Sequence, residues 1–92
     1  MKTLTILYRE RCPYCAAAKR GLKELYNENP VYERVPLKWI EETEQPQVAD
    51  TYPYWYVPSI FDEKEKLFEA SPADTFDTLK KALRTALESA SR

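Results

Sequence analysis

Two cysteines, Cys12 and Cys15, are the residues of this chain best suited to chemistry. They are separated by Pro13 and Tyr14, which gives the Cys-x-x-Cys spacing of a redox site. At such a site one thiolate attacks a substrate disulfide, and the second thiol resolves the mixed disulfide that forms. The chain has no histidine and one glycine, which excludes His-based triads, His metal ligands and glycine-rich phosphate loops. The leading hypothesis is therefore dithiol redox chemistry.

The dithiol lies between a predicted strand and a predicted helix. Residues 2–8 alternate between polar and apolar side chains, as in a half-buried strand. Pro13 suits the first turn of a helix, where its missing N–H is not needed, and good helix formers follow over 16–27. The apolar stripe of this helix would contain Cys15, Ala18, Leu22 and Leu25. We therefore expect Cys15 to be buried and Cys12 to lie at the helix N-terminus.

These positions predict different roles for the two cysteines. At the N-terminus of a helix, unpaired backbone N–H groups and the helix dipole stabilise the thiolate of Cys12. Arg9 and Arg11 add positive charge nearby, which also favours the nucleophilic form. We expect Cys12 to attack the substrate and the buried Cys15 to resolve the mixed disulfide.

Three other uses of the cysteine pair remain as alternatives. A structural disulfide would close a loop of only four residues and would constrain little chain entropy. A zinc site would need further ligands from a second chain. An iron–sulfur cluster could bridge two subunits, with one cysteine from each chain.

The rest of the chain predicts an α/β fold with the element order βαβαββα. Its further elements are expected at 31–39 (strand), 41–52 (short helix), 56–62 and 66–70 (a hairpin) and 71–90 (helix). Ser71 is the expected N-cap of the last helix, with Pro72 at the first helical position. Strands joined through a helix pair in parallel, whereas the hairpin adds antiparallel strands. We therefore expect a single domain over residues 1–92, with a four-stranded mixed sheet flanked by helices.

The composition limits the classes of partner. The 14 basic and 15 acidic residues give a formal net charge of -1, so no basic surface is expected for nucleic acid or for a membrane. The first residues lack the long apolar stretch of a signal peptide, and no stretch is long enough to span a membrane. We expect a cytoplasmic protein, and a monomer.

The residues around the dithiol resemble those of the glutaredoxins, a family with the thioredoxin-like fold. Cys12-Pro13-Tyr14-Cys15 is the tetrad typical of dithiol glutaredoxins, and the preceding segment 8–11 resembles the end of the first strand in that family. The Val57-Pro58 pair resembles the Val-Pro step of the family. The expected order of elements agrees with this fold along nearly the whole chain.

The resemblance implies a glutathione-binding groove around Cys12. Pro58 would be a cis proline packed against the Cys-x-x-Cys site, and the backbone of Val57 would pair with a peptide-like substrate. Arg9 would meet a carboxylate of glutathione. The full set of residues implied to bind glutathione or substrate is Arg9, Arg11, Pro13, Tyr14, Tyr56, Val57, Pro58 and Ser71. Glutathione would serve as reductant or co-substrate, and neither a tightly bound cofactor nor a metal is implied.

The chain also departs from the glutaredoxin pattern. Tyr56 stands where the family usually has threonine before Val-Pro, and the Gly-Gly pair near the glutamyl end of bound glutathione is missing. Glu69 would repel a carboxylate there, whereas Ser71 either helps to hold one or merely caps the last helix. The aromatic run 52–56 either forms a wall for a partner protein or packs the second helix against the sheet.

The sequence thus predicts a disulfide oxidoreductase that acts on protein disulfides or on glutathione mixed disulfides. Its expected partners are glutathione, disulfide-containing proteins, and a glutathione or thioredoxin reductase. Two alternatives remain open: an electron donor that is recharged by thioredoxin reductase, and a carrier of a subunit-bridging iron–sulfur cluster.

Overall fold

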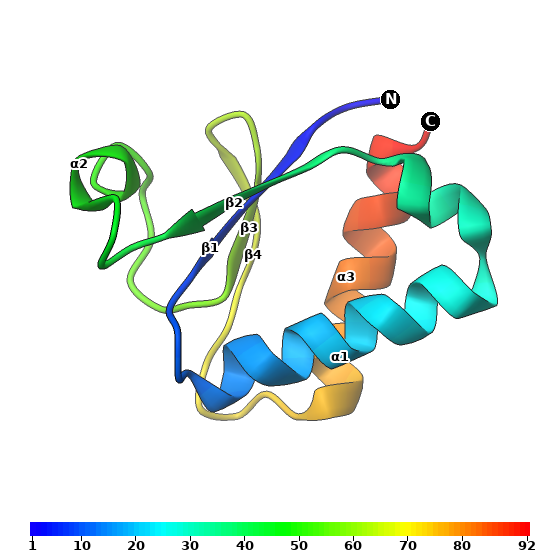
Figure 1. Cartoon of the computed structure of the whole chain (residues 1–92), viewed down its shortest axis with the longest axis horizontal. Coiled ribbons are helices and arrows are strands. Elements are labelled where there is room, and N and C mark those ends of the chain that lie inside the picture. The colour runs from blue at the N-terminus through cyan, green and yellow to red at the C-terminus, as the bar shows by residue number, and fades with distance from the viewer.

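A computed structural model describes all 92 residues and contains one four-stranded sheet between helices (Figure 1). The strands are β1 (Leu4–Tyr8), β2 (Leu37–Glu41), β3 (Ser59–Asp62) and β4 (Glu65–Glu69). The helices are α1 (Pro13–Glu28), α2 (Pro46–Ala49) and α3 (Phe76–Ala90), with a 3-10 helix, η1 (Pro30–Arg34), after α1. The strand order is β2-β1-β3-β4. β1 is parallel to β2 and antiparallel to β3, and β3 is antiparallel to β4, which confirms the mixed sheet expected from the sequence.

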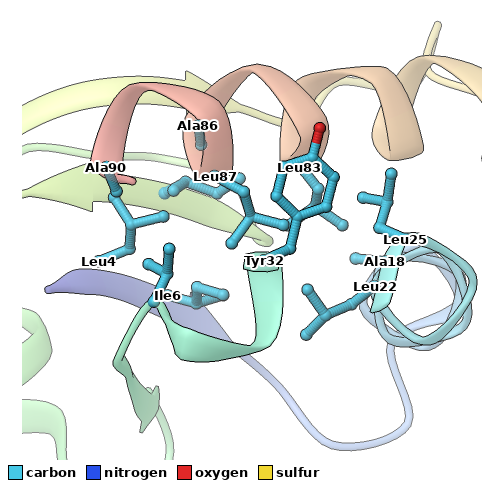
Figure 2. Close-up of a cluster of buried hydrophobic side chains, with 12 residues drawn as sticks. Leu4, Ile6, Ala18, Leu22, Leu25, Tyr32, Leu83, Ala86, Leu87 and Ala90 are labelled. Carbon is cyan, nitrogen blue, oxygen red and sulfur yellow. The ribbon is translucent and has the colours of Figure 1, made fainter. Parts of the chain in front are cut away.

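The main hydrophobic core lies between the sheet and the pair α1 and α3 (Figure 2). Leu4 and Ile6 of β1 point into it, as the alternation along this strand predicts. Its other large members are Leu22 and Leu25 from α1, Tyr32 from η1, Ile60 from β3, and Leu83 and Leu87 from α3. The predicted stripe of α1 is thus the face that holds this helix, and the cysteines at its start, against the sheet.

The opposite face of the sheet is covered by a smaller layer around α2. Leu7, Ile40 and Phe61 are fully buried there and pack with Ala49 of α2. The rings of Tyr52 and Tyr54 meet Phe61 edge to face, with centroids 5.0 and 6.5 Å away. For these two tyrosines, the prediction that the aromatic run packs the second helix against the sheet is confirmed.

The single glycine of the chain lies where α1 and α3 pack closely. A Cβ atom at Gly21 would be 3.2 Å from Cβ of Lys80, which is tighter than an ordinary contact, so a larger residue would require Lys80 to shift by a few tenths of an ångström. The ammonium of Lys80 pairs with Glu24 at 2.9 Å, and it also pairs with Glu28 across the same contact. α1 is therefore held in place by α3 along its length.

None of the helices combines the length and apolar character needed to cross a membrane.

The strand predicted over 31–39 is wrong in its first half. Residues 30–34 form the 3-10 helix η1, in which the side chain of Asn29 accepts a hydrogen bond from the N–H of Val31 at 3.1 Å. Asn29 as N-cap and Pro30 at the first position favour a helical turn, and this local capping outweighs the β-propensity of Val31. The strand itself starts at Leu37 and runs to Glu41, a residue that the sequence placed in a helix.

Three other predicted boundaries are corrected. The short helix expected over 41–52 is limited to α2, and the first hairpin strand begins at Ser59 rather than at residue 56. The N-cap of α3 is Thr75 and not Ser71. Thr75 and Thr78 form a reciprocal capping box, in which each side chain accepts a hydrogen bond from the other's backbone N–H, at 2.8 and 3.3 Å.

Candidate active site

Cys12 is the N-cap residue of α1, at the end of the loop that follows β1. Its backbone is extended, with φ -90° and ψ 119°, and its Sγ atom accepts a hydrogen bond from the N–H of Cys15 at 3.3 Å. The sulfur therefore lies at the positive end of the helix dipole and replaces the oxygen of an ordinary cap. The role of Cys12 as the nucleophile stays a prediction.

Cys15 lies one turn further on, on the buried face of α1. Its side chain is 3% exposed, and neither cysteine is in a disulfide, so the structure describes the reduced dithiol. Burial raises the pKa of the Cys15 thiol to about 12, against a smaller opposing effect from a hydrogen bond with the backbone of Arg9. The two sulfurs thus differ as the sequence predicted: one is accessible at a helix start, and the other is buried and protonated.

A second loop, between α2 and β3, meets the dithiol at Val57. The Val57–Pro58 peptide bond is cis, and the carbonyl oxygen of Val57 lies 3.9 Å from Sγ of Cys12. The backbone N–H of Val57 has no hydrogen-bond partner within the chain. An extended peptide could therefore pair with Val57 while it presents a sulfur atom to Cys12.

Arg9, expected to meet a carboxylate of glutathione, is paired within the protein. Its Nη2 atom lies 2.8 Å from Oε2 of Glu42, whose other oxygen accepts a hydrogen bond from the hydroxyl of Tyr54 at 2.6 Å. An external carboxylate would have to compete with Glu42 for this guanidinium. Arg11 has a φ of 66°, in the left-handed region that residues other than glycine rarely adopt, and it turns the chain into Cys12.

Several predicted groove residues meet on the far side of Cys12. A cavity of about 60 Å³ is lined by Tyr14, Tyr56, Val57, Ala70, Ser71 and Pro72. The polar groups of Ser71 are already used, because its N–H and hydroxyl both donate to Oδ2 of Asp74, at 2.7 and 3.3 Å. The hydroxyl of Tyr14 donates to the carbonyl of Pro72 at 3.3 Å. The pocket is thus small and largely apolar, and it offers few free donors for a carboxylate.

A second opening leads to Cys15 from the other side of the β1–α1 loop. It has a volume of about 290 Å³, and its lining includes Arg9, Cys12, Cys15 and Lys19. The ammonium of Lys19 lies 4.5 Å from the ring centroid of Tyr8 and 5.6 Å from that of Trp39. Sequence reasoning missed Lys19, although it follows Cys15 by four residues and so lies on the same side of the helix.

Glu41 is a second residue that sequence reasoning missed. Its carboxylate, on a residue only 4% exposed, accepts hydrogen bonds from the N–H of Glu10 at 3.0 Å and from the Thr43 hydroxyl at 2.6 Å. These bonds, the Thr43 hydroxyl first, lower the pKa of Glu41 to about 2. Glu41 is therefore ionised at neutral pH, and it ties the loop before Cys12 to the end of β2.

Glu69 does the same for the second loop. Its Oε2 atom accepts hydrogen bonds from the N–H groups of Trp55 and Tyr56, at 2.6 and 2.7 Å, and its Oε1 atom pairs with Lys66 at 2.6 Å. Partial burial acts to raise the pKa of Glu69, but Lys66 and the two N–H groups outweigh it and lower the pKa. Sequence reasoning assigned Glu69 only a repulsive role, since the N–H groups that it binds lie 13 and 14 residues away in the chain.

Comparisons with known proteins agree with this fold. The chain is 36% identical over 76 residues to a thioredoxin from Methanocaldococcus jannaschii, and the match covers 83% of this chain and 85% of that protein. No family model matches the chain. The fold is that of the thioredoxin-like proteins, and the chain belongs to the thioredoxin family of thiol–disulfide oxidoreductases.

Solved structures support the same fold. A thioredoxin mutant from Halobacterium salinarum NRC-1 superimposes with a TM-score of 0.60 at 21% identity, over 98% of this chain and 74% of that chain. Thioredoxin 1 from Thermosipho africanus gives a TM-score of 0.57 at 13% identity, over 98% and 99% of the two chains. The resemblance to glutaredoxins thus identified the fold correctly, whereas the proteins found to be similar are thioredoxins.

Proposed function

We propose that this protein reduces disulfides in other proteins, with Cys12 as the attacking thiolate and Cys15 as the resolving thiol. The observation that carries the proposal is the asymmetry of the two sulfurs. Cys12 lies at a helix N-terminus against the carbonyl of Val57, whereas Cys15 is 3% exposed behind it. A substrate sulfur can therefore reach Cys12 first, and Cys15 acts only after Cys12 has reacted.

The reaction proceeds by two thiol–disulfide exchanges. The Cys12 thiolate attacks one sulfur of the substrate, so that a Cys12–substrate bond forms and the substrate S–S bond breaks. The departing sulfur leaves as a thiolate and takes a proton from water. Cys15 then loses its proton and attacks Sγ of Cys12, which releases the second substrate thiol. Two electrons have passed to the substrate, and Cys12 and Cys15 are joined in a disulfide.

The electron donor that we propose is a dithiol reductase of the thioredoxin reductase kind. Internal carboxylates support this choice over glutathione. Glu42 pairs with Arg9, and Asp74 takes the N–H of Ser71, so the groups implied to bind the two ends of glutathione already have partners. Glutathione remains a second candidate, because the Cys-Pro-Tyr-Cys tetrad and the cavity beside Tyr14 favour it.

The test compares the two donors on one substrate. Reduction of insulin disulfides would be followed with NADPH and thioredoxin reductase, with NADPH, glutathione and glutathione reductase, and with dithiothreitol as a chemical donor. We expect turnover with thioredoxin reductase and with dithiothreitol. If the protein turns over with glutathione but not with thioredoxin reductase, the choice of donor is wrong. If it does not turn over even with dithiothreitol, the proposed function is wrong.

A further inference from the structure

Two aromatic side chains beside the active site point into solvent. Trp55 is 88% exposed and Tyr56 is 58% exposed, and no other aromatic residue of the chain is a large exposed hydrophobic residue. Tyr52 and Tyr54, from the same loop, instead pack against Phe61. The loop thus separates its aromatic residues into a buried pair and an exposed pair.

The exposed pair is held in place by its backbone. One carboxylate oxygen of Glu69 accepts hydrogen bonds from the N–H groups of both Trp55 and Tyr56, and Lys66 neutralises the other oxygen. The carbonyl of Tyr56 accepts a hydrogen bond from the hydroxyl of Ser59, at the start of β3. Because these bonds order the loop before anything binds, little conformational entropy is lost when the aromatic side chains make a contact.

The position of the pair specifies which part of a substrate it can meet. Val57 follows Tyr56 directly, and its carbonyl is 3.9 Å from Sγ of Cys12. A polypeptide that brings a cysteine to Cys12 along Val57 would place its neighbouring residues toward Tyr56 and Trp55, the two residues that precede Val57. Tyr56 also lines the apolar cavity of about 60 Å³, which holds roughly two water volumes and so fits a small side chain.

We propose that Trp55 and Tyr56 form a docking surface for the polypeptide segment next to the reactive cysteine of a protein substrate. The segment would present an apolar side chain, because the carboxylate of Glu69 on β4 is already bound to the loop backbone and the exposed groups of the loop are aromatic. This inference rests on the proposed function and adds a substrate class: proteins with an apolar residue near the target disulfide. A small aliphatic disulfide has no neighbouring polypeptide segment to place against the two rings.

The test measures kcat and KM for insulin with dithiothreitol as donor. It also measures the second-order rate constant for bis(2-hydroxyethyl) disulfide, a small disulfide with no aromatic ring, with the pre-reduced protein after dithiothreitol has been removed. In the double variant Trp55→Ala and Tyr56→Ala, we expect KM for insulin to rise about tenfold or more, as for loss of aromatic anchors at an interface. The kcat for insulin and the rate constant for the small disulfide should stay within about twofold, since Cys12, Cys15 and the backbone of Val57 are unchanged.

Two further variants serve as controls. Val31→Ala removes another exposed apolar side chain, on η1, and should change neither the KM for insulin nor the rate constant for the small disulfide. The single variant Trp55→Phe, in which Tyr56 is unchanged, keeps an aromatic side chain at both positions and should retain most of the affinity for insulin. Thermal melting should be unchanged in all variants, because the altered side chains are exposed.

The outcomes separate this inference from the proposed function. An equal loss on both substrates, or an unchanged KM for insulin, would overturn the docking surface while leaving the redox chemistry intact. Failure of the wild-type protein to reduce either substrate would instead overturn the proposed function.

Discussion

The two loops that meet at Cys12 are both held by a glutamate, but they contribute different groups to the site. In the first loop, one backbone N–H is bound by Glu41 at the end of β2. In the second loop, two backbone N–H groups are bound by Glu69 at the end of β4. The first loop leads into Cys12 at the start of α1, whereas the second turns Trp55 and Tyr56 toward solvent. Reactivity and recognition thus lie on separate segments, which mutations can alter one at a time.

The largest effect is expected when the sulfur of Cys12, to which the first loop leads, is replaced. Cys12→Ser should reduce activity to background on every disulfide, because a serine hydroxyl is not ionised near neutral pH and Cys15 is buried. Cys15→Ser should still form the first bond and should accumulate as a mixed disulfide with the substrate. Mass spectrometry before and after reduction would detect this adduct, and an adduct on Cys12→Ser would reassign the nucleophile.

A smaller effect is expected at Glu41, the glutamate that holds the first loop, and it appears in how the stability of the protein depends on pH. The folded pKa of Glu41, about 2, lies below its ordinary value of 4.5, so its carboxylate stabilises the fold above pH 4.5. That stability is lost as the pH falls from 4.5 toward 2. The free energy of unfolding of the wild type, measured with denaturant, should therefore decrease as the pH falls over this range. Glu41→Gln should have a lower free energy of unfolding at neutral pH, and this free energy should depend less on pH below 4.5.

Glu69→Gln is the matched variant for the second loop. Gln keeps one acceptor oxygen but loses the charge that faces Lys66 and two N–H groups, and such charge-assisted hydrogen bonds contribute about 1.5–3 kcal/mol. We expect reduction of insulin to suffer in this variant and the small disulfide to be unaffected. A Glu69→Gln protein that lost activity on both substrates would show that the loops are not separable.

The smallest effect is expected at Lys19 of α1, whose charge acts on Cys15. Its charge lowers the pKa of Cys15, though by less than burial raises it. Lys19→Met should therefore raise the pKa of Cys15 further and slow its reaction about two- to fivefold at a given pH, in proportion to the smaller thiolate fraction. The rate of Cys15 alkylation in the Cys12→Ser background would measure this. Lys23→Met, one turn along α1, is the control, and an equal change there would exclude a local effect of Lys19.

Local patterns in the sequence were enough to predict the first loop. A strand, two cysteines three residues apart and a proline at a helix start are all contiguous, and the helical period alone buries Cys15 beside Ala18 and Leu22. The resemblance to glutaredoxins added the cis peptide bond at Pro58, which the structure contains. The expected sheet and the order of elements are also present.

The sequence did not reveal what holds the two loops. The acidic run beginning at Glu41 is typical of a solvated helix, and only the pairing of β2 with β1 brings its carboxylate to the N–H of Glu10, 31 residues away. Glu69 likewise reaches Trp55 only once β3 and β4 have formed a hairpin. Such contacts depend on tertiary geometry, which no local spacing encodes, and the same holds for the different exposures of the tyrosines in 52–56.

The sulfur of Cys12 also serves as the helix cap, so the first turn of α1 reports the chemical state of the site. The N–H of Cys15 donates to that sulfur in the reduced protein, at 3.3 Å. When Cys12 carries a substrate, its sulfur is a neutral disulfide atom and a much poorer acceptor than a thiolate. Hydrogen–deuterium exchange at the Cys15 amide should therefore quicken in the trapped adduct, which gives each stage of turnover a signature in the backbone itself.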